Sequence, residues 1–328
     1  MAEIEIILLA FVAIAFASGG NAAASTKEAG HAGHEYGNFI ELSYPLDNNT
    51  LHWPANDGFN YTVAIDDERK DQYGQSHYVK SDNIHMAIHS GTHLDAPVHF
   101  SRTGLTVDKI PLNKLIRVPV KVIDLSEKVK ANKSYSFTIE DFQDSKINAS
   151  LVQEKSVVLV YTGVSDSYSG GNKSYFGTDS KNIEEMKIPG FSKEAAMHLV
   201  ARNVYGVGLD APSVDSSTRH AANGVMDPVA HVTFAKANIY MIENINTKLA
   251  EVLHMQQNGH EMRLTILPLP IVSASGSPIR LLAEPLSNIA REAIKAPTNS
   301  ASSYLPRMRE IVLIACFAVA FTMNQRFG

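Results

Sequence analysis

The sequence predicts a single α/β domain, because short strand patterns alternate with amphipathic helix patterns and no linker-like break separates them. The chain has 328 residues, of which 45% are hydrophobic, so it can bury a sizeable core. Its net charge of −5 and the absence of a Lys/Arg-rich block give no electrostatic footprint for nucleic acid. A globular protein that does not bind nucleic acid is therefore expected.

Five segments are predicted as strands, because they combine apolar alternation with β-branched residues and are bounded by turn residues. These segments are 61–64, 83–89, 118–124, 156–161 and 204–209. A helix is predicted over 192–200, with Ser192 as its N-cap and Pro189-Gly190 just upstream. A second helix is predicted over 226–237.

The two ends of the chain differ from this domain, which is expected to cover residues 39–290. Residues 1–24 are predicted to be a secretory signal peptide, because an apolar run precedes small residues that a signal peptidase could cleave. Glu3 and Glu5 stand where positive charge is usual, so a buried or membrane-anchoring helix is the alternative. Residues 25–38 are small and polar and are predicted to be a flexible leader.

The tail, residues 291–328, contains an apolar run at 311–323 that is shorter than the roughly 20 residues of a transmembrane helix. Small residues and a polar spacer before the run fit a glycolipid-anchor signal, which would attach the protein to a membrane. The polar ending fits an amphipathic or core-docked helix instead. Both interpretations place the tail outside the catalytic body.

Secretion or display on the cell surface is also favoured by Asn-x-Ser/Thr triplets, the acceptors of N-glycosylation. They occur at Asn48, Asn60, Asn132, Asn148 and Asn172. The only cysteine, Cys316, lies in the C-terminal apolar run. The domain is therefore expected to have neither a disulfide nor a thiolate metal ligand.

The segment from His89 to Phe100 holds three histidines and one carboxylate. His89 is expected to end the strand 83–89 on its polar face. Gly91 then breaks the strand and allows a turn that brings His93 and Asp95 back toward His89. Imidazoles and carboxylates bind Zn²⁺ and Mn²⁺, and a site with an open position can activate water. The segment predicts a divalent metal site, of which His85 would be at most a neighbour.

The pattern His-x-Gly-Thr-His-x-Asp-x-Pro-x-His-Phe in this segment resembles the motif of the cyclase family of metal-dependent hydrolases. That family includes bacterial-type kynurenine formamidases and isatin hydrolases. The resemblance extends over about 39–286 through segments 42–45, 53–54, 189–192, 206–215, 238–245 and 276–280. Ala55 and Val164 depart from the family at positions that concern the substrate pocket, where glycine and tryptophan are common.

The resemblance implies a mixed, barrel-like β-sheet flanked by helices. It implies an enzyme that hydrolyses a linear or cyclic amide C–N bond with metal-activated water, as in tryptophan catabolism. One or two ions, Zn²⁺ or Mn²⁺, a small aromatic or cyclic amide substrate and a homo-oligomer are implied as well.

The resemblance also implies residue roles. His89, His93 and Asp95 would be metal ligands, with Asp95 able to bridge two ions. His231 and Glu243 would complete the ligand set. His99 would be the general acid/base, and Trp53 would pack against an aromatic substrate.

Residue chemistry supports these roles independently of the family. An imidazole such as that of His99 has a suitable pKa for taking a proton from water and passing it to a departing nitrogen. Glu243 follows the apolar run 239–242, where a carboxylate is costly unless it is paired or bound to metal. His231 could alternatively be a hydrogen-bonded core histidine.

Other functions lack their motifs or remain as alternatives. No Gly-x-Ser-x-Gly elbow of a serine hydrolase is present. Gly206-Val207-Gly208 lacks the third glycine of a dinucleotide loop and is predicted to reflect close packing at a strand end. The alternative from another class is a secreted or cell-surface ligand-binding protein that retains the fold without turnover.

Overall fold

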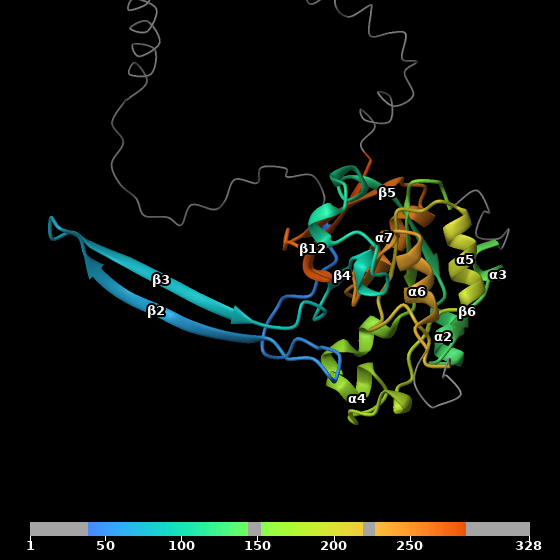
Figure 1. Cartoon of the computed structure of the whole chain (residues 1–328), viewed down its shortest axis with the longest axis horizontal. Helices are drawn as coiled ribbons and strands as arrows, with labels where there is room; N and C mark the ends of the chain where they lie inside the picture. The colour runs from blue at the N-terminus through green and yellow to red at the C-terminus, as the bar shows by residue number, and fades with distance from the viewer. Residues whose placement is uncertain (1–38, 144–151, 219–226, 287–328) are drawn as a thin grey trace, which may run out of the picture. The chain divides into compact units, whose positions relative to one another are not determined.

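The computed structural model describes residues 39–143, 152–218 and 227–286, and these form an α/β fold around a closed, mixed β-sheet (Figure 1). Seven of its strands follow one another in the order β12-β11-β5-β7-β9-β10-β4, and β4 pairs with β12 to close the ring. Their bounds are β4 His93–Asp95, β5 Val118–Asp124, β7 Val157–Tyr161, β9 Gly206–Leu209, β10 Tyr240–Glu243, β11 Met262–Pro268 and β12 Gly276–Pro285. The predicted single α/β domain with a barrel-like sheet is confirmed.

Strands β5, β7, β9 and β10 run parallel, whereas β4, β11 and β12 join the ring through antiparallel pairs. The sequence of β7 is an almost continuous apolar run, which is typical of a strand buried on both faces. Val157 and Leu159 belong to one core cluster, and Val158 and Val160 belong to the other. The alternation of side chains along this strand therefore joins two cores.

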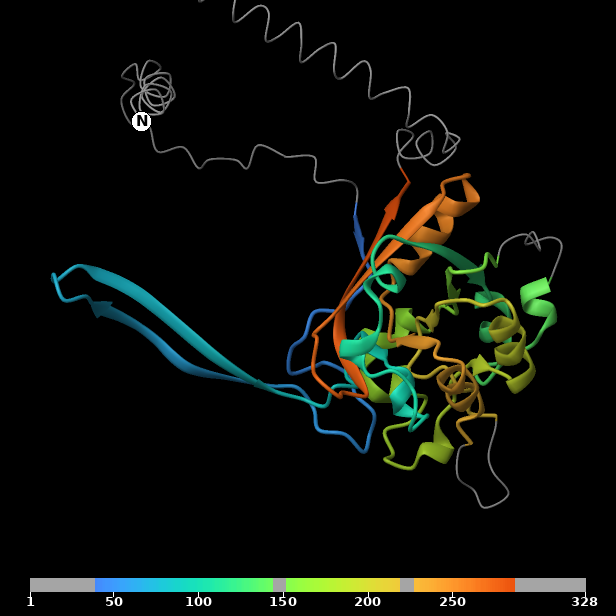
Figure 2. The ribbon, with the colours of Figure 1, turned by 45° about the horizontal axis from the view of Figure 1, so that its top comes forward.

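Each core also takes side chains from helices. The first includes Leu249 and Val252 of helix α7, Leu249–Gln257. The second includes side chains of helix α5, Lys193–Ala201, and helix α6, Val229–Lys236. The ring of strands is thus packed against helices of different parts of the chain, as Figure 2 shows.

The glycines of β9 allow the close approach that the sequence predicted. A Cβ atom on Gly206 would lie 2.1 Å from the ring of Tyr240, and one on Gly208 would lie 2.8 Å from the carbonyl oxygen of Ile242. Both distances are too short for a real side chain. These glycines pack β9 against β10, and β10 carries Glu243.

The predicted secondary structure is correct for β5 and for α5, whose N-cap Ser192 accepts a hydrogen bond from the backbone of Ala195. The prediction of a strand over 83–89 is wrong beyond His85. The partner strand begins at Asn60, opposite His85, so no ladder partner continues the pairing toward His89. The helix predicted over 226–237 begins at Val229, and residue 226 lies outside the described residues.

A long hairpin lies outside the barrel and is formed by β2, Asn60–Lys70, and β3, Ser76–His85 (Figures 1 and 2). Its side chains are exposed almost without exception. The remaining short strands are β1 Ile40–Glu41, β6 Ser136–Phe137 and β8 Gly190–Phe191. The other helices are α2 Ser126–Ala131, α3 Glu140–Gln143 and α4 Gly171–Tyr175, with 3₁₀ turns η1 Pro97–His99, η2 Val107–Lys109, η3 Leu112–Lys114, η5 Val164–Gly170 and η6 Ile183–Glu185.

The predicted signal peptide, leader and C-terminal tail lie outside the described residues. Among the residues that the structure describes, no helix is long and apolar enough to cross a membrane.

Candidate metal centre

Strand β4 places His93 and Asp95 on the same face, because side chains two residues apart in a strand point the same way. Leu94, between them, points to the other face and is fully buried in the core. The Nε2 atom of His93 lies 3.2 Å from Oδ1 of Asp95. The shortest strand of the barrel thus holds two of the predicted ligands side by side.

His89 reaches the same carboxylate from an irregular segment rather than from the end of a strand. Gly91 has a φ of 59°, which lets the chain turn between His89 and β4 as predicted. Nδ1 of His89 lies 2.6 Å from Oδ1 of Asp95, and its Nε2 lies 3.0 Å from the hydroxyl of Ser275. A Cβ on Gly276 would lie 2.6 Å from the His89 ring, so this glycine makes room for the imidazole.

Glu243 and His231 come from distant parts of the sequence. Strand β10 pairs with β4 so that Glu243 lies opposite His93, with Oε2 of the glutamate 3.5 Å from Nε2 of the histidine. His231 lies in the first turn of α6. Its Nε2 is 3.2 Å from Asp95 and 3.2 Å from Glu243. The five predicted ligands therefore meet in space.

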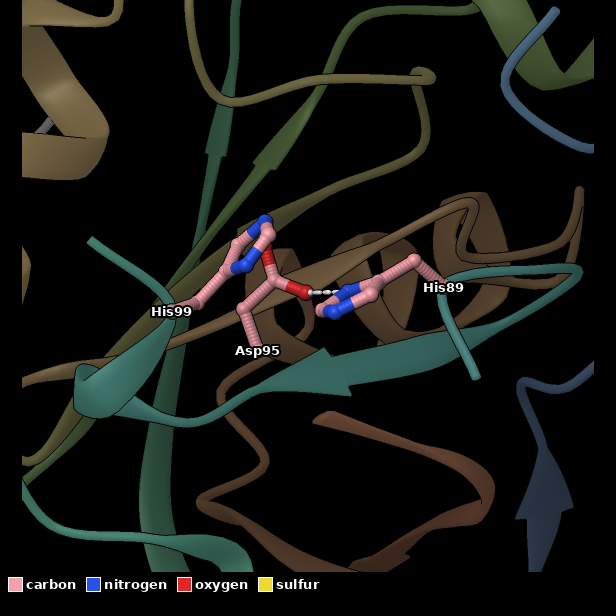
Figure 3. Close-up of side chains that lie close together, drawn as sticks. All are labelled: His89, Asp95 and His99. Carbon is pink, nitrogen blue, oxygen red and sulfur yellow. Dashed lines mark hydrogen bonds and ion pairs between the residues drawn. The ribbon is translucent and has the colours of Figure 1, made fainter. Parts of the chain in front are cut away.

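His99 lies at the edge of this cluster, at the end of the 3₁₀ turn η1. Its ring stacks on that of His89 with centroids 4.0 Å apart, and Figure 3 shows both rings beside Asp95. Burial lowers the pKa of His99 to about 4. The ring is therefore neutral at pH 7, and the same shift makes it a weaker base than a free imidazole.

Two other histidines of the cluster, His93 and His231, have pKa values shifted the other way. Burial alone would lower the pKa of His93, but the negative charges of Asp95 and Glu243 raise it to about 9. Burial likewise opposes the charge on His231, yet Asp215, Asp95 and Glu243 raise its pKa well above the usual value. The neighbouring histidines in turn hold the pKa of Asp95 well below its usual value, although burial acts to raise it.

The donor set fits a divalent cation. Two groups of ligand atoms, each within 4.8 Å of one another, share Asp95: one with His89 and His99, the other with His93 and Glu243. Asp95 and Glu243 are only 1% and 5% exposed, and buried carboxylates need a cation or hydrogen-bond donors around them. Nitrogen and oxygen donors of this kind suit zinc and manganese alike.

A cavity of about 350 Å³ opens beside the cluster. Trp53 contributes to its wall and packs edge-on against Phe176, with centroids 6.4 Å apart. Apart from the titratable cluster, the lining is mostly apolar and includes Leu51, Trp53, Phe100, Phe176, Ile183, Pro212 and Pro228, together with the polar residues His52, Asn56, Ser213, Asp215 and Asn244. The cavity thus has one polar, titratable wall and one apolar wall.

Sequence reasoning missed three residues that support the cluster. Asp215 contacts His231, and Ser275 contacts His89. Asn244 donates one hydrogen bond from its amide to the carbonyl of Gly91 and accepts one from the hydroxyl of Tyr175. Asp215 and Asn244 lie within segments that resemble the family, but nothing in their local pattern indicated what they contact. By contrast, His85 is exposed beside Asp57, away from the cluster.

The fold and the cluster define an α/β barrel protein with a candidate metal centre at the wall of a cavity. Comparison with known proteins identifies the family. The model of the Cyclase family matches residues 40–216, more than half of the chain, so this chain belongs to the cyclase family.

Curated relatives and solved structures agree with this family. The chain is 28% identical over 250 residues to a kynurenine formamidase of Bacillus cytotoxicus, covering 76% of this chain and 98% of that protein. It is similar to isatin hydrolase A from Labrenzia aggregata bound to benzyl benzoate, with a TM-score of 0.60, 25% identity and coverage of 75% and 92%. Isatin hydrolase A from Ralstonia solanacearum gives a TM-score of 0.61, 25% identity and coverage of 75% and 90%.

Metal affinity is expected to rise with pH, because His93 must lose a proton before its nitrogen can bind a cation. The neutral fraction of a group with a pKa of about 9 grows roughly tenfold per pH unit below that value. Titration calorimetry with Zn²⁺ between pH 6 and 8, in buffers of different ionisation enthalpy, should show tighter binding at higher pH and release of protons. An affinity that stays constant over this range would contradict the assignment of His93 as a ligand.

Proposed function

We propose that this protein is a metal-dependent hydrolase that cleaves a linear or cyclic amide C–N bond in a small aromatic substrate. The observation that carries the proposal is the convergence of five imidazole and carboxylate side chains from four segments at the wall of a cavity. The kynurenine formamidases and isatin hydrolases among its relatives support the same reaction class.

In the proposed enzyme, His89, His93, Asp95, His231 and Glu243 hold one or two divalent ions, Zn²⁺ or Mn²⁺. When bound, the cation supplies Lewis acidity, which lowers the pKa of water and polarises an amide carbonyl. The sharing of Asp95 between two groups of ligand atoms supports a site for two ions.

His99 is the proposed general acid/base. Its neutral ring can take a proton from the attacking water and return it to the departing amide nitrogen. The stack against His89 holds the ring at the cavity wall, where it can reach both the attacking water and the departing amide nitrogen. His99 is also within reach of Asp95 as a ligand, so its role must be separated from metal binding by experiment.

The apolar wall determines the proposed substrate class. The aromatic rings of Trp53, Phe100 and Phe176 line the cavity and can contact a flat aromatic ring. A substrate held there would present its amide to the polar wall. N-formylkynurenine and isatin, the substrate types suggested by the relatives, are both aromatic amides of this kind.

The hairpin of β2 and β3 supports assembly into a homo-oligomer. Cross-strand pairing and alternation place Tyr61, Val63, Tyr78 and Ile84 on one face, where they are 42%, 50%, 56% and 59% exposed. The same face also carries charged residues, because Val63 pairs with Asp82 and Asp66 pairs with Lys80, whereas Thr62 pairs with Asn83 on the opposite face. A two-stranded hairpin without packing is marginally stable in water. We propose that a second copy of the chain covers the face that carries Tyr61, Val63, Tyr78 and Ile84.

Entry into the secretory pathway is proposed from the predicted signal peptide and the sequons. Four sequon asparagines lie within the described residues, Asn48, Asn60, Asn132 and Asn172, and all four are exposed. Exposure is what a glycan requires. Attachment of the protein to a membrane through residues 291–328 is likewise a proposal that rests on the sequence pattern alone.

Hydrolysis should be detectable on a panel of N-formylkynurenine, isatin and simple cyclic amides with metal-loaded protein. The His99→Ala variant is expected to lose about 10²- to 10⁴-fold in kcat while keeping its metal content. His85→Ala, which changes an exposed histidine, should leave both unchanged. Activity that survives His99→Ala would refute the role of His99, and stoichiometric metal without turnover on the whole panel would favour the non-catalytic binding protein.

Assembly through the hairpin can be tested by light scattering coupled to size-exclusion chromatography on unglycosylated protein. The double variant Val63→Lys, Ile84→Lys should shift the protein toward monomer, because it replaces two exposed apolar side chains of the proposed interface with charged ones. The matched double variant Thr62→Lys, Asn83→Lys changes the opposite face of the same strands and should not. Equal masses for both variants and the wild type would show that the hairpin is not the interface.

Secretion should be visible on expression of the full chain in eukaryotic cells. The protein is expected in the medium or on the surface, with a mass that falls on treatment with an N-glycosidase. Asn132→Gln should remove one glycan, because Asn132 is exposed in a turn. Retention of an unmodified protein inside the cell would contradict this localisation.

A further inference from the structure

Asp215 is fully buried behind His231, on the side away from Asp95 and Glu243. Its Oδ2 lies 2.5 Å from Nδ1 of His231 and 3.3 Å from the backbone nitrogen of the same residue. Its Oδ1 accepts a hydrogen bond of 2.6 Å from the backbone of Ala230. One carboxylate thus contacts both the imidazole ring and the first turn of α6.

The segment that carries Asp215 is itself held tightly. The backbone nitrogen of Asp215 donates to the hydroxyl of Ser213, and that of Val214 donates to Oε1 of Glu243 over 2.8 Å. A Cβ on Gly190 would lie 2.3 Å from the backbone of Asp215, so β8 packs directly against it. The segment 213–215 therefore fixes the orientation of two of the five predicted ligands.

We propose that Asp215 is a positioning residue that keeps the proton of the His231 imidazole on Nδ1, so that Nε2 is free to bind a cation. The inference rests on the proposed function, because it assigns His231 as a metal ligand. An ionised carboxylate only accepts hydrogen bonds, so the ring nitrogen 2.5 Å away must be the donor. When the ring loses its second proton on metal binding, that proton leaves the other nitrogen, which faces Asp95 and Glu243 and then offers its lone pair to the cation.

His231 depends on this partner more than the other histidines depend on theirs. Nδ1 of His93 contacts the carbonyl oxygen of Gly91, and Nε2 of His89 contacts the hydroxyl of Ser275. A carbonyl is a neutral acceptor, and a hydroxyl can donate or accept. Only His231 has a carboxylate outside the cluster as its second partner within the described residues, which also raises the basicity of its ligating nitrogen.

The isosteric variant Asp215→Asn makes the inference sharp. If the side-chain oxygen of the introduced asparagine still accepts the hydrogen bond from the backbone of Ala230, its NH₂ group faces Nδ1 of His231. Nδ1 must then accept a hydrogen bond instead of donating one. The proton then moves to Nε2, the nitrogen that must bind the cation. In the opposite rotamer the NH₂ group meets the backbone N–H of Ala230 without an acceptor. The wild-type combination of contacts is therefore lost in either rotamer.

The test is a titration of metal-free protein with Co²⁺, followed by its visible absorption, for the wild type, Asp215→Asn and Asp141→Asn. Asp141 is the matched control, since it is a buried aspartate that accepts hydrogen bonds from Tyr135 and Thr138 and does not line the cavity. Asp215→Asn is expected to weaken Co²⁺ binding about 10- to 100-fold, and Asp141→Asn should leave it unchanged. Thermal unfolding of each metal-free protein separates loss of stability from loss of affinity.

A measurement on the wild type keeps the inference testable if Asp215→Asn does not fold. In Zn²⁺-loaded protein labelled with ¹⁵N-histidine, His231 should show a protonated Nδ1 and a metal-bound Nε2, with the signals assigned by their loss in His231→Gln. A protonated Nε2, or an unchanged Co²⁺ affinity in folded Asp215→Asn, would overturn the role of Asp215. Failure of the wild type to bind Co²⁺ or Zn²⁺ would instead overturn the proposed metal centre itself.

Discussion

Two buried carboxylates, Asp95 and Glu243, impose the constraint on which the rest of the site depends. Each lies almost out of contact with solvent, where an unpaired negative charge would be strongly unfavourable. The surrounding histidines meet this requirement in the metal-free protein, since the raised pKa values of His93 and His231 keep positive charge beside the carboxylates. A divalent cation would replace those protons with two positive charges at the same place. The cluster is thus electrostatically compensated in both states, and metal binding must be coupled to proton release.

The barrel closes at the site itself. Strand β4 has only three residues, yet it pairs with β10 on one side and with β12 on the other. His93 and Asp95 are at once members of this seam and members of the cluster. Asn244, just after β10, ties the turn at Gly91 to the same region. The integrity of the site and the closure of the sheet therefore depend on the same few residues.

Local sequence patterns predicted those parts of the molecule that depend on local interactions. The strand 118–124, the helix capped by Ser192 and the turn at Gly91 follow from alternation, capping and backbone freedom. The end of β3 was misjudged because it depends on where the partner strand begins, which the alternation around His89 does not reveal. His231 and Glu243 were named only through the family resemblance, because the contacts of His231 with Asp95 and of Glu243 with His93 arise from helix packing and strand pairing across more than a hundred residues. Asp215 and Ser275 were missed for the same reason, since their significance lies in a contact and not in a pattern.

The two walls of the cavity come from different segments, so the residues that contact the substrate can vary independently of the predicted metal ligands. The titratable wall is fixed by β4, β10, α6 and the segment before β4, all of which are part of the barrel or packed on it. The apolar wall is taken from segments around Trp53, Phe176 and Pro212, which contribute no ligand. Substitutions there can change which ring fits without disturbing the donors to the cation. Relatives named for a formamidase and for an isatin hydrolase are compatible with this separation. Ala55 and Val164, the two departures from the family, are not among the residues that line this cavity. In the proposed enzyme, the ligand geometry would therefore constrain the reaction class, whereas the aromatic wall would select the substrate.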